Sequence, residues 1–194
     1  SIEYNAAESF LKRRDLMSRV FIVSSTPRKS GNSEILAEEF ARGAREAGHE
    51  VEKIELRNRE LKFCIGCLSC LKTGKCVLDD TINELLPRVR RADVLVFATP
   101  IYYYGLSGQL KTFLDRMNAL YGKENSFKRV YLLASAADTE ESAFDGAIKG
   151  MQGWIDCFEG VRLAGVIKGA GVESAGEIRN TRFPQEAYET GKAL

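Results

Sequence analysis

Three apolar runs constrain the fold of this chain more than any other feature of its sequence. VFIVS at 20–24, DVLVFATP at 93–100 and RVYLLASAA at 129–137 carry no charged side chain beyond their first residues. Such near-continuous apolar segments are typical of strands that are buried on both faces of a parallel sheet. They alternate with amphipathic segments such as residues 33–50, which predicts helices on both faces of the sheet, joined by right-handed crossovers.

Weaker patterns supply the remaining elements. Further strands are expected at 51–56 and 161–169, and further helices at 79–92, 107–121, 139–158 and 183–194. The predicted fold class is therefore α/β, with a five-stranded parallel sheet covered on both faces. An anion-binding loop directly after the first strand, described below, fits the order 2-1-3-4-5 of a flavodoxin-like three-layer sandwich. A length of 194 residues predicts one domain over 1–194, with an N-terminal helical extension over 1–18 and a cysteine-containing insertion over 57–78.

The charge balance narrows the classes of partner. The 28 Lys and Arg against 27 Asp and Glu leave a formal charge of +1, so no basic field favours nucleic acid or a membrane surface. No apolar stretch approaches the roughly 20 residues of a membrane span, and the first 20 residues lack the apolar centre of a signal peptide. We therefore expect a cytoplasmic protein.

The loop after the first strand is rich in groups that bind phosphate. A helix that begins directly after it would direct its positive end at the same point. The available side chains are those of Ser25, Thr26, Arg28, Ser30, Asn32 and Ser33. Neither G-x-G-x-x-G nor G-x-x-x-x-G-K-[ST] is present, which favours a monophosphate, and FMN in particular, over a dinucleotide or triphosphate. The alternative is an ordinary turn with Ser33 as a helix N-cap.

A second candidate loop follows the third predicted strand. Three adjacent tyrosines and a glycine there suit a flat aromatic ring, because aromatic faces can flank it and glycine lets the backbone approach. The loop consists of Pro100, Ile101, Tyr102, Tyr103, Tyr104 and Gly105. The alternative is that individual tyrosines pack under the sheet. A small-residue loop around Ser135 could close the other side of the ring.

Four of the five cysteines lie within thirteen residues. Cys64, Cys67, Cys70 and Cys76 have the spacing C-x2-C-x2-C-x5-C, which suits three corners of one cubane and a fourth ligand from a short loop. A [4Fe-4S] cluster, free thiols, zinc and a redox-active disulfide remain open at this point. Cys157, on a predicted helix, is expected to be a small buried residue.

Three motifs in order carry a family resemblance: STPRKSGNS, CIGCLSCLKTGKC followed by Asp79 and Asp80, and TPIYYYGLSGQLKTFLDR. Together they resemble the NAD(P)H-dependent FMN reductases of the flavodoxin-like superfamily, and in particular their iron–sulfur flavoprotein branch. The resemblance implies that Thr26, Arg28, Ser30, Asn32 and Ser33 hold the FMN phosphate. It implies that the loop from Pro100 to Gly105 and the loop around Ser135 hold the ring. Ser25 departs from the glycine that is usual there, which would narrow the phosphate site.

The resemblance also implies a function. Electrons from NAD(P)H would pass through FMN to a quinone, a flavin or another small-molecule or protein acceptor, and the cysteines would hold a [4Fe-4S] cluster. No protein acid or base is needed, so no catalytic residue is predicted. A homodimer or homotetramer is implied, with flavin pockets completed by neighbouring subunits. The alternatives are an electron carrier that does not oxidise NAD(P)H and a non-catalytic binding protein on the same fold.

Overall fold

The computed structural model of the chain describes residues 17–194. The helical extension expected over residues 1–18 therefore lies almost wholly outside the described residues. Residues 17 and 18 themselves lead into the first strand without helical structure.

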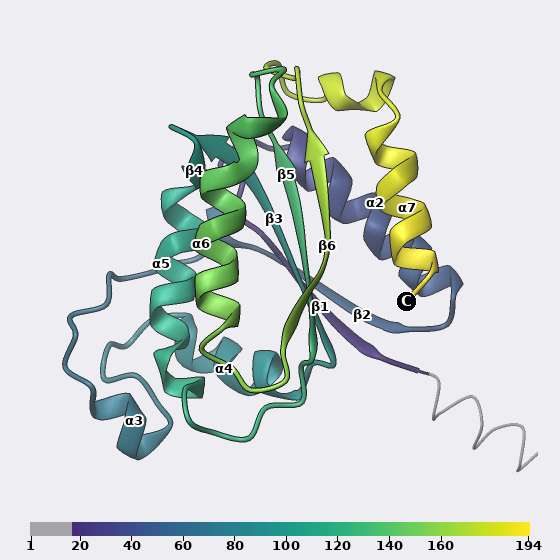
Figure 1. Cartoon of the computed structure of the whole chain (residues 1–194). Helices are drawn as coiled ribbons and strands as arrows, with labels where there is room; N and C mark the ends of the chain where they lie inside the picture. The colour runs from purple at the N-terminus through teal and green to yellow at the C-terminus, as the bar shows by residue number, and fades with distance from the viewer. Residues whose placement is uncertain (1–16) are drawn as a thin grey trace, which may run out of the picture.

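Five parallel strands form the sheet in the predicted order (Figure 1). They are β1 (Arg19–Ser24), β2 (Glu50–Glu55), β3 (Val94–Tyr102), β5 (Arg129–Ser135) and β6 (Arg162–Gly169), arranged as β2-β1-β3-β5-β6. The predicted strand count is one too low, because β4 (Gly105–Leu106) pairs antiparallel with the end of β3. A strand of two residues carries no apolar periodicity that a sequence could show.

Helices cover both faces of the sheet (Figure 1). One face is covered by α2 (Asn32–Glu46) and α7 (Phe183–Lys192), and the other by α4 (Ile82–Arg91), α5 (Gly108–Arg116) and α6 (Asp145–Ile155). The short helix α3 (Ser69–Thr73) and four 3-10 turns complete the described elements: η1 (Leu56–Asn58), η2 (Met117–Leu120), η3 (Glu141–Phe144) and η4 (Glu177–Asn180). No helix among residues 17–194 is long and apolar enough to cross a bilayer.

Strand β1 shows why the sheet is buried on both sides. Phe21 and Val23 pack in the core under α4 and α5, while Val20 and Ile22 pack in the core under α2. Successive side chains of a strand point to opposite faces, so an uninterrupted apolar run fills both cores. Because the five long strands are parallel, they all end at the same edge of the sheet. The loops after β1, β3 and β5 meet there (top of Figure 1).

Candidate functional site

Buried hydrogen bonds join the loop after β1 to the loop after β3. The backbone N–H and the hydroxyl of Ser25 both donate to the carbonyl of Ala98, at 2.9 and 3.0 Å. The hydroxyl of Ser107 donates to that of Ser25 at 2.9 Å, and the Ser107 N–H donates to Thr99 Oγ1 at 3.1 Å. Ser25 therefore faces β3, and its hydroxyl fixes the two loops together instead of lying free in the phosphate loop.

The start of α2 has the features of an anion site. Among the described residues no side chain caps this helix, whose N-cap is Gly31. The alternative of Ser33 as an N-cap is therefore wrong: Ser33 lies within the helix, it is buried, and its hydroxyl has no hydrogen-bond partner in the described part of the chain. A Cβ on Gly31 would lie 2.5 Å from Thr26 Oγ1 and 3.1 Å from the Arg28 carbonyl, so a larger residue there would displace the loop. Uncapped N–H groups and a buried hydroxyl without a partner fit a phosphate.

The other predicted phosphate ligands are placed less uniformly. Thr26 is buried and its Oγ1 accepts from the Arg28 N–H at 3.3 Å, while the exposed Arg28 guanidinium donates to the carbonyl of Glu173 at 2.7 Å. The Asn32 amide is used at both ends, since it donates to Ser174 O at 3.0 Å and accepts from Ile178 N at 3.2 Å. Asn32 thus fixes the loop after β6 to the start of α2.

Glu34 is a residue that the sequence interpretation missed. Its buried carboxylate accepts from the N–H of Ser30, a residue with a φ of 55°, at 2.9 Å. It also accepts from Arg57 at 2.9 Å and lies 3.6 Å from Lys53. Burial raises the pKa of Glu34, but hydrogen bonding to Arg57 and the charges of Arg57 and Lys53 outweigh it and hold the pKa below its usual value. The sequence does carry a signal for this contact: Glu34 lies three residues after the N-cap Gly31, which is the position of the acidic residue in a capping box.

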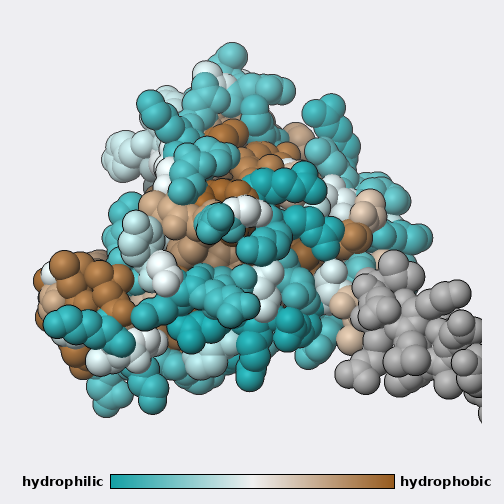
Figure 2. Space-filling model, turned by 60° about the horizontal axis from the view of Figure 1, so that its bottom comes forward, coloured by the Kyte–Doolittle hydropathy of each residue, from teal (hydrophilic) through white to brown (hydrophobic). Residues whose placement is uncertain are grey.

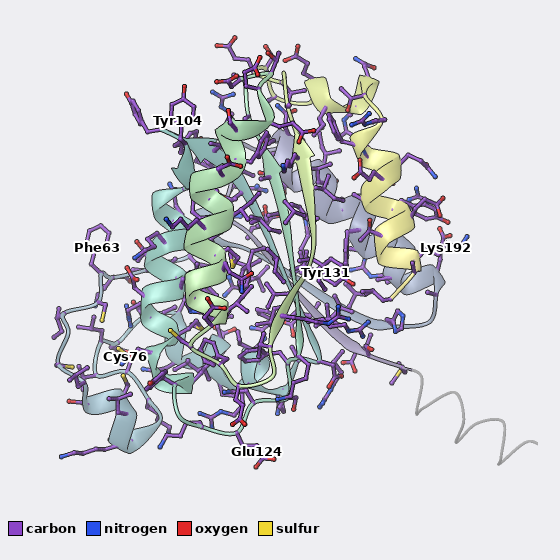
Figure 3. All side chains as sticks on the ribbon, in the orientation of Figure 1. Phe63, Cys76, Tyr104, Glu124, Tyr131 and Lys192 are labelled. Carbon is purple, nitrogen blue, oxygen red and sulfur yellow. The ribbon has the colours of Figure 1, made fainter. Side chains whose placement is uncertain are left out.

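The tyrosines form an exposed turn beside this site. Tyr102 pairs with Gly105, and the two residues between them, Tyr103 and Tyr104, have φ values of 47° and 62°. All three tyrosines are exposed, and Tyr104 projects away from the sheet (Figure 3), so the alternative that they pack under the sheet is wrong. Positive φ at both central positions defines a type I′ turn, which normally selects Asn and Gly. Backbone strain held by bulky residues is typical of binding sites.

Glycines and the neighbouring strand ends complete this region. A side chain on Gly146, in α6, would collide with the carbonyl of Tyr104, so α6 packs directly against the backbone of the turn. A Cβ on Gly105 would meet only Tyr102 O, at 3.7 Å, which leaves open space over the turn. Pro100 and Ile101 belong to β3 itself, and Pro100 is paired in register with the buried Ser135 at the end of β5.

The four clustered cysteines line one cavity, on the α5 side of the molecule. Its volume is about 330 Å³, and Asp115 and Asn118 contribute to the same wall. The cysteines that line it are Cys64, Cys67, Cys70 and Cys76. All are free thiols, and within residues 17–194 no three His, Cys, Asp or Glu side chains are placed to hold a single metal ion. A cubane binds each thiolate at a different iron, so its ligands surround a cavity rather than one point. The donor set and the shared cavity fit a cluster.

A buried ion pair holds the cysteine segment against α5. Arg116 and Asp80 have no exposed side-chain surface and are 2.6 Å apart. Asp80 also accepts from the N–H groups of Lys62, at 2.8 Å, and Ile82, at 3.0 Å. Burial raises the pKa of Asp80, but the Arg116 guanidinium and these N–H groups outweigh it and lower the pKa. Asp80 thus joins Lys62, near the start of the segment, to Arg116 in α5.

The outer surface of the cysteine segment is apolar. Four large side chains are exposed there and contribute to the brown patch at the left of Figure 2: Phe63, Ile65, Leu68 and Val77. Phe63 points away from the fold (Figure 3). Cys157, by contrast, lies past the end of α6 and is exposed, so the prediction of a buried cysteine is wrong. The expected helix over 139–158 ends at Ile155, two residues before it.

Comparison with known proteins decides the family. Residues 18–147 match the sequence profile of the NADPH-dependent FMN reductases. The chain belongs to this family. An iron–sulfur flavoprotein of Methanocaldococcus jannaschii is 38% identical over 102 residues, which cover 53% of each chain. An iron–sulfur flavoprotein of Archaeoglobus fulgidus is 36% identical over 115 residues, which cover 59% of this chain and 51% of that one.

The chain spans about half the length of these curated relatives. Among solved structures, an NAD(P)H:quinone oxidoreductase from Methanothermobacter marburgensis superposes with a TM-score of 0.72 at 24% identity. The superposition covers 92% of this chain and 96% of that one. The family resemblance and the flavodoxin-like fold inferred from the sequence are both confirmed.

Proposed function

We propose that this protein binds FMN where β1, β3 and β5 end and uses it to pass electrons from NAD(P)H to an acceptor. The observation that carries the proposal is the buried Ser33 hydroxyl, which has no partner among the described residues and lies at an uncapped helix start. The Ser25–Ser107 hydrogen bond fixes this phosphate site to the loop that carries the tyrosine turn. Family membership supports the same ligand.

Each group has a distinct task in this site. Ser33, Thr26 and the first N–H groups of α2 bind the phosphate, and Arg28 adds a positive charge at its open side. Ser30, exposed in the loop, contributes its hydroxyl, whereas the Asn32 amide keeps its structural contacts. FMN supplies two-electron chemistry between a nicotinamide and an acceptor.

The second half of the site orients the flat part of the ligand. The tyrosine turn, from Pro100 to Gly105, and the end of β5 at Ser135 lie side by side in the register of the sheet. The exposed faces of Tyr102 and Tyr104 flank the ring, and the space over Gly105 lets it approach the backbone. No acid or base of the protein is required for the transfer.

The cysteine cavity extends this proposal. Cys64, Cys67, Cys70 and Cys76 hold a [4Fe-4S] cluster that takes part in the electron path, as the names of the iron–sulfur flavoprotein relatives suggest for those proteins. The acceptor is a quinone, a flavin or another small molecule or protein. The protein acts in the cytoplasm as a homodimer or homotetramer.

Anaerobic stopped-flow mixing of the FMN-loaded protein with NADPH, and in parallel with NADH, tests the reductase function. The expected result is loss of the flavin absorbance near 450 nm within the time of a catalytic turnover. Flavin that stays oxidised under both nucleotides contradicts it.

That contrary result would leave the second candidate, an electron carrier between partner proteins. One observation favours this candidate: apolar side chains are exposed around the cysteine cavity, where a partner protein could dock. Iron and sulfide analysis tests the cluster itself. Cys67→Ser should lose most of the iron, and Cys157→Ser, at an exposed cysteine outside the cavity, should retain it.

A further inference from the structure

One hydrogen bond to a cysteine sulfur comes from a residue that no motif singled out. Asn118 lies in η2, directly after α5, and lines the cysteine cavity. Its Nδ2 donates to the sulfur of Cys70 at 3.4 Å. Within residues 17–194 the side-chain amide of Asn118 makes no other hydrogen bond. It therefore neither caps a helix nor joins two strands.

A buried cation lies two residues before Asn118 in the chain. The Arg116 guanidinium donates to Asp80 at 2.6 Å and to the carbonyl of Lys62, so it holds the chain on both sides of the cysteines against the end of α5. Its Nε is buried and has no partner in the described part of the chain.

The last cysteine of the segment is held through its backbone. The Cys76 N–H donates to Asn83 Oδ1 at 2.8 Å, and Asn83 Nδ2 returns a hydrogen bond to the Cys76 carbonyl at 2.9 Å. Within residues 17–194, Cys70 is therefore the cavity cysteine whose sulfur accepts a side-chain hydrogen bond.

Donors to thiolate sulfur stabilise the state of a cluster that carries more negative charge, which is the reduced state. We propose that Asn118 raises the reduction potential of the cysteine-bound cluster through its hydrogen bond to Cys70. Asn118 is a tuning residue, since it acts through the sulfur of a cysteine. This inference rests on the proposed [4Fe-4S] site and goes beyond it, because it assigns the control of electron affinity to the α5–η2 turn.

The test is an anaerobic spectroelectrochemical titration of the holoprotein, in which cluster and flavin are followed separately. Asn118→Leu keeps the size of the side chain and removes the donor. At a fixed potential near the midpoint, the ratio of reduced to oxidised cluster should fall roughly tenfold, which is about 59 mV for one electron. The flavin midpoint should stay unchanged, and Asn118→Gln, which keeps an amide, should recover much of the shift.

Asn58→Leu is the matched control. Asn58 is an exposed asparagine in η1 whose amide donates to Glu55, not to sulfur. It should leave both midpoints as they are. An unchanged cluster midpoint in Asn118→Leu overturns the inference, and so does an equal shift in the control.

Two further results remain decisive. If Asn118→Leu does not retain iron, Asn118→Asp takes its place, because a carboxylate beside Cys70 opposes an added electron; a midpoint that does not become more negative overturns the inference. If the unaltered protein holds no iron or sulfide, this inference fails with the cluster. Flavin reduction by NADPH would then show that the reductase function stands independently.

Discussion

The phosphate loop (residues 25–31) and the cysteine segment (residues 57–78) are held in place in different ways. The phosphate loop is joined to β3 by buried hydrogen bonds of Ser25, and Asn32, directly after it, binds the loop after β6. The cysteine segment has no buried residue in its helix α3. It is held by polar contacts to Asp80, Asn83 and Arg116 and by the partly buried Leu61, Cys70 and Cys76, which pack against the core.

The two sites therefore depend on the sheet to different degrees. The contacts that shape the phosphate loop are also contacts between neighbouring strands, so the flavin site forms when the sheet forms. The cysteine site depends on Asp80, which precedes α4, and on groups of α4 and α5, and it can be altered while the sheet persists. Four variants test this difference.

The largest effect is expected at the buried ion pair. Arg116→Met leaves the Asp80 carboxylate buried without its partner, which should lower the free energy of unfolding by about 3–5 kcal/mol in a urea titration. Asp80→Asn combined with Arg116→Met should recover most of that loss. Arg42→Met, which removes exposed ion pairs to Glu39 and Glu46 on α2, serves as control and should cost far less, because solvent screens exposed pairs. Equal losses for Arg42→Met and Arg116→Met would contradict the assigned role.

Arg28 tests the charge at the phosphate. Arg28→Ala should weaken FMN binding by about 1.5–3 kcal/mol, roughly tenfold to a hundredfold, because a charge-assisted hydrogen bond is lost. Riboflavin, which has no phosphate, should bind the variant and the unaltered protein alike. Isothermal titration with both ligands measures this, and equal weakening of the two would exclude the assigned contact.

The tyrosine turn tests whether strain is kept for binding. Tyr103→Asn with Tyr104→Gly introduces the pair that a type I′ turn prefers and should relieve strain of about 1–3 kcal/mol. The melting temperature of the ligand-free protein should rise by a few degrees, while its affinity for riboflavin should fall. A melting temperature that falls would show that the tyrosines stabilise the turn.

The smallest effect is expected at Ser33. Its hydroxyl has no partner among residues 17–194, so Ser33→Ala should leave the stability of the ligand-free protein unchanged or slightly higher. FMN affinity should fall by about 1 kcal/mol, roughly fivefold. Ser24→Ala is the matched control, since it removes another buried hydroxyl without a partner among the described residues, at the last position of β1, and should change neither quantity. A fivefold loss in both variants would contradict a specific contact.

The sequence predicts those parts of the molecule whose signal is local. The apolar runs of β1, β3 and β5 identify the strands, and their alternation with helices indicates a parallel sheet, because parallel strands need crossovers. The strand order follows from the phosphate-binding character of the loop after β1. The antiparallel pairing of β4 depends on the turn at Tyr103 and Tyr104 and leaves no pattern of its own.

The parts that sequence could not supply depend on contacts between distant residues. Ser25 and Ser107 are hydrogen-bonded across 82 positions, and Asn32 reaches Ile178 across 146. The side chains of Ser25 and Asn32 could both bind a phosphate. Only the structure shows that each already hydrogen-bonds to another part of the protein. Cys157 was misplaced for a similar reason, since its exposure depends on where α6 ends.

FMN binding at the start of α2 can be measured by titrating the protein with FMN, following flavin fluorescence, and repeating the titration with riboflavin. We expect saturable quenching with one FMN per chain and an affinity for FMN well above that for riboflavin, because the start of α2 binds the phosphate. Quenching that never saturates, or equal affinities for the two ligands, would contradict it.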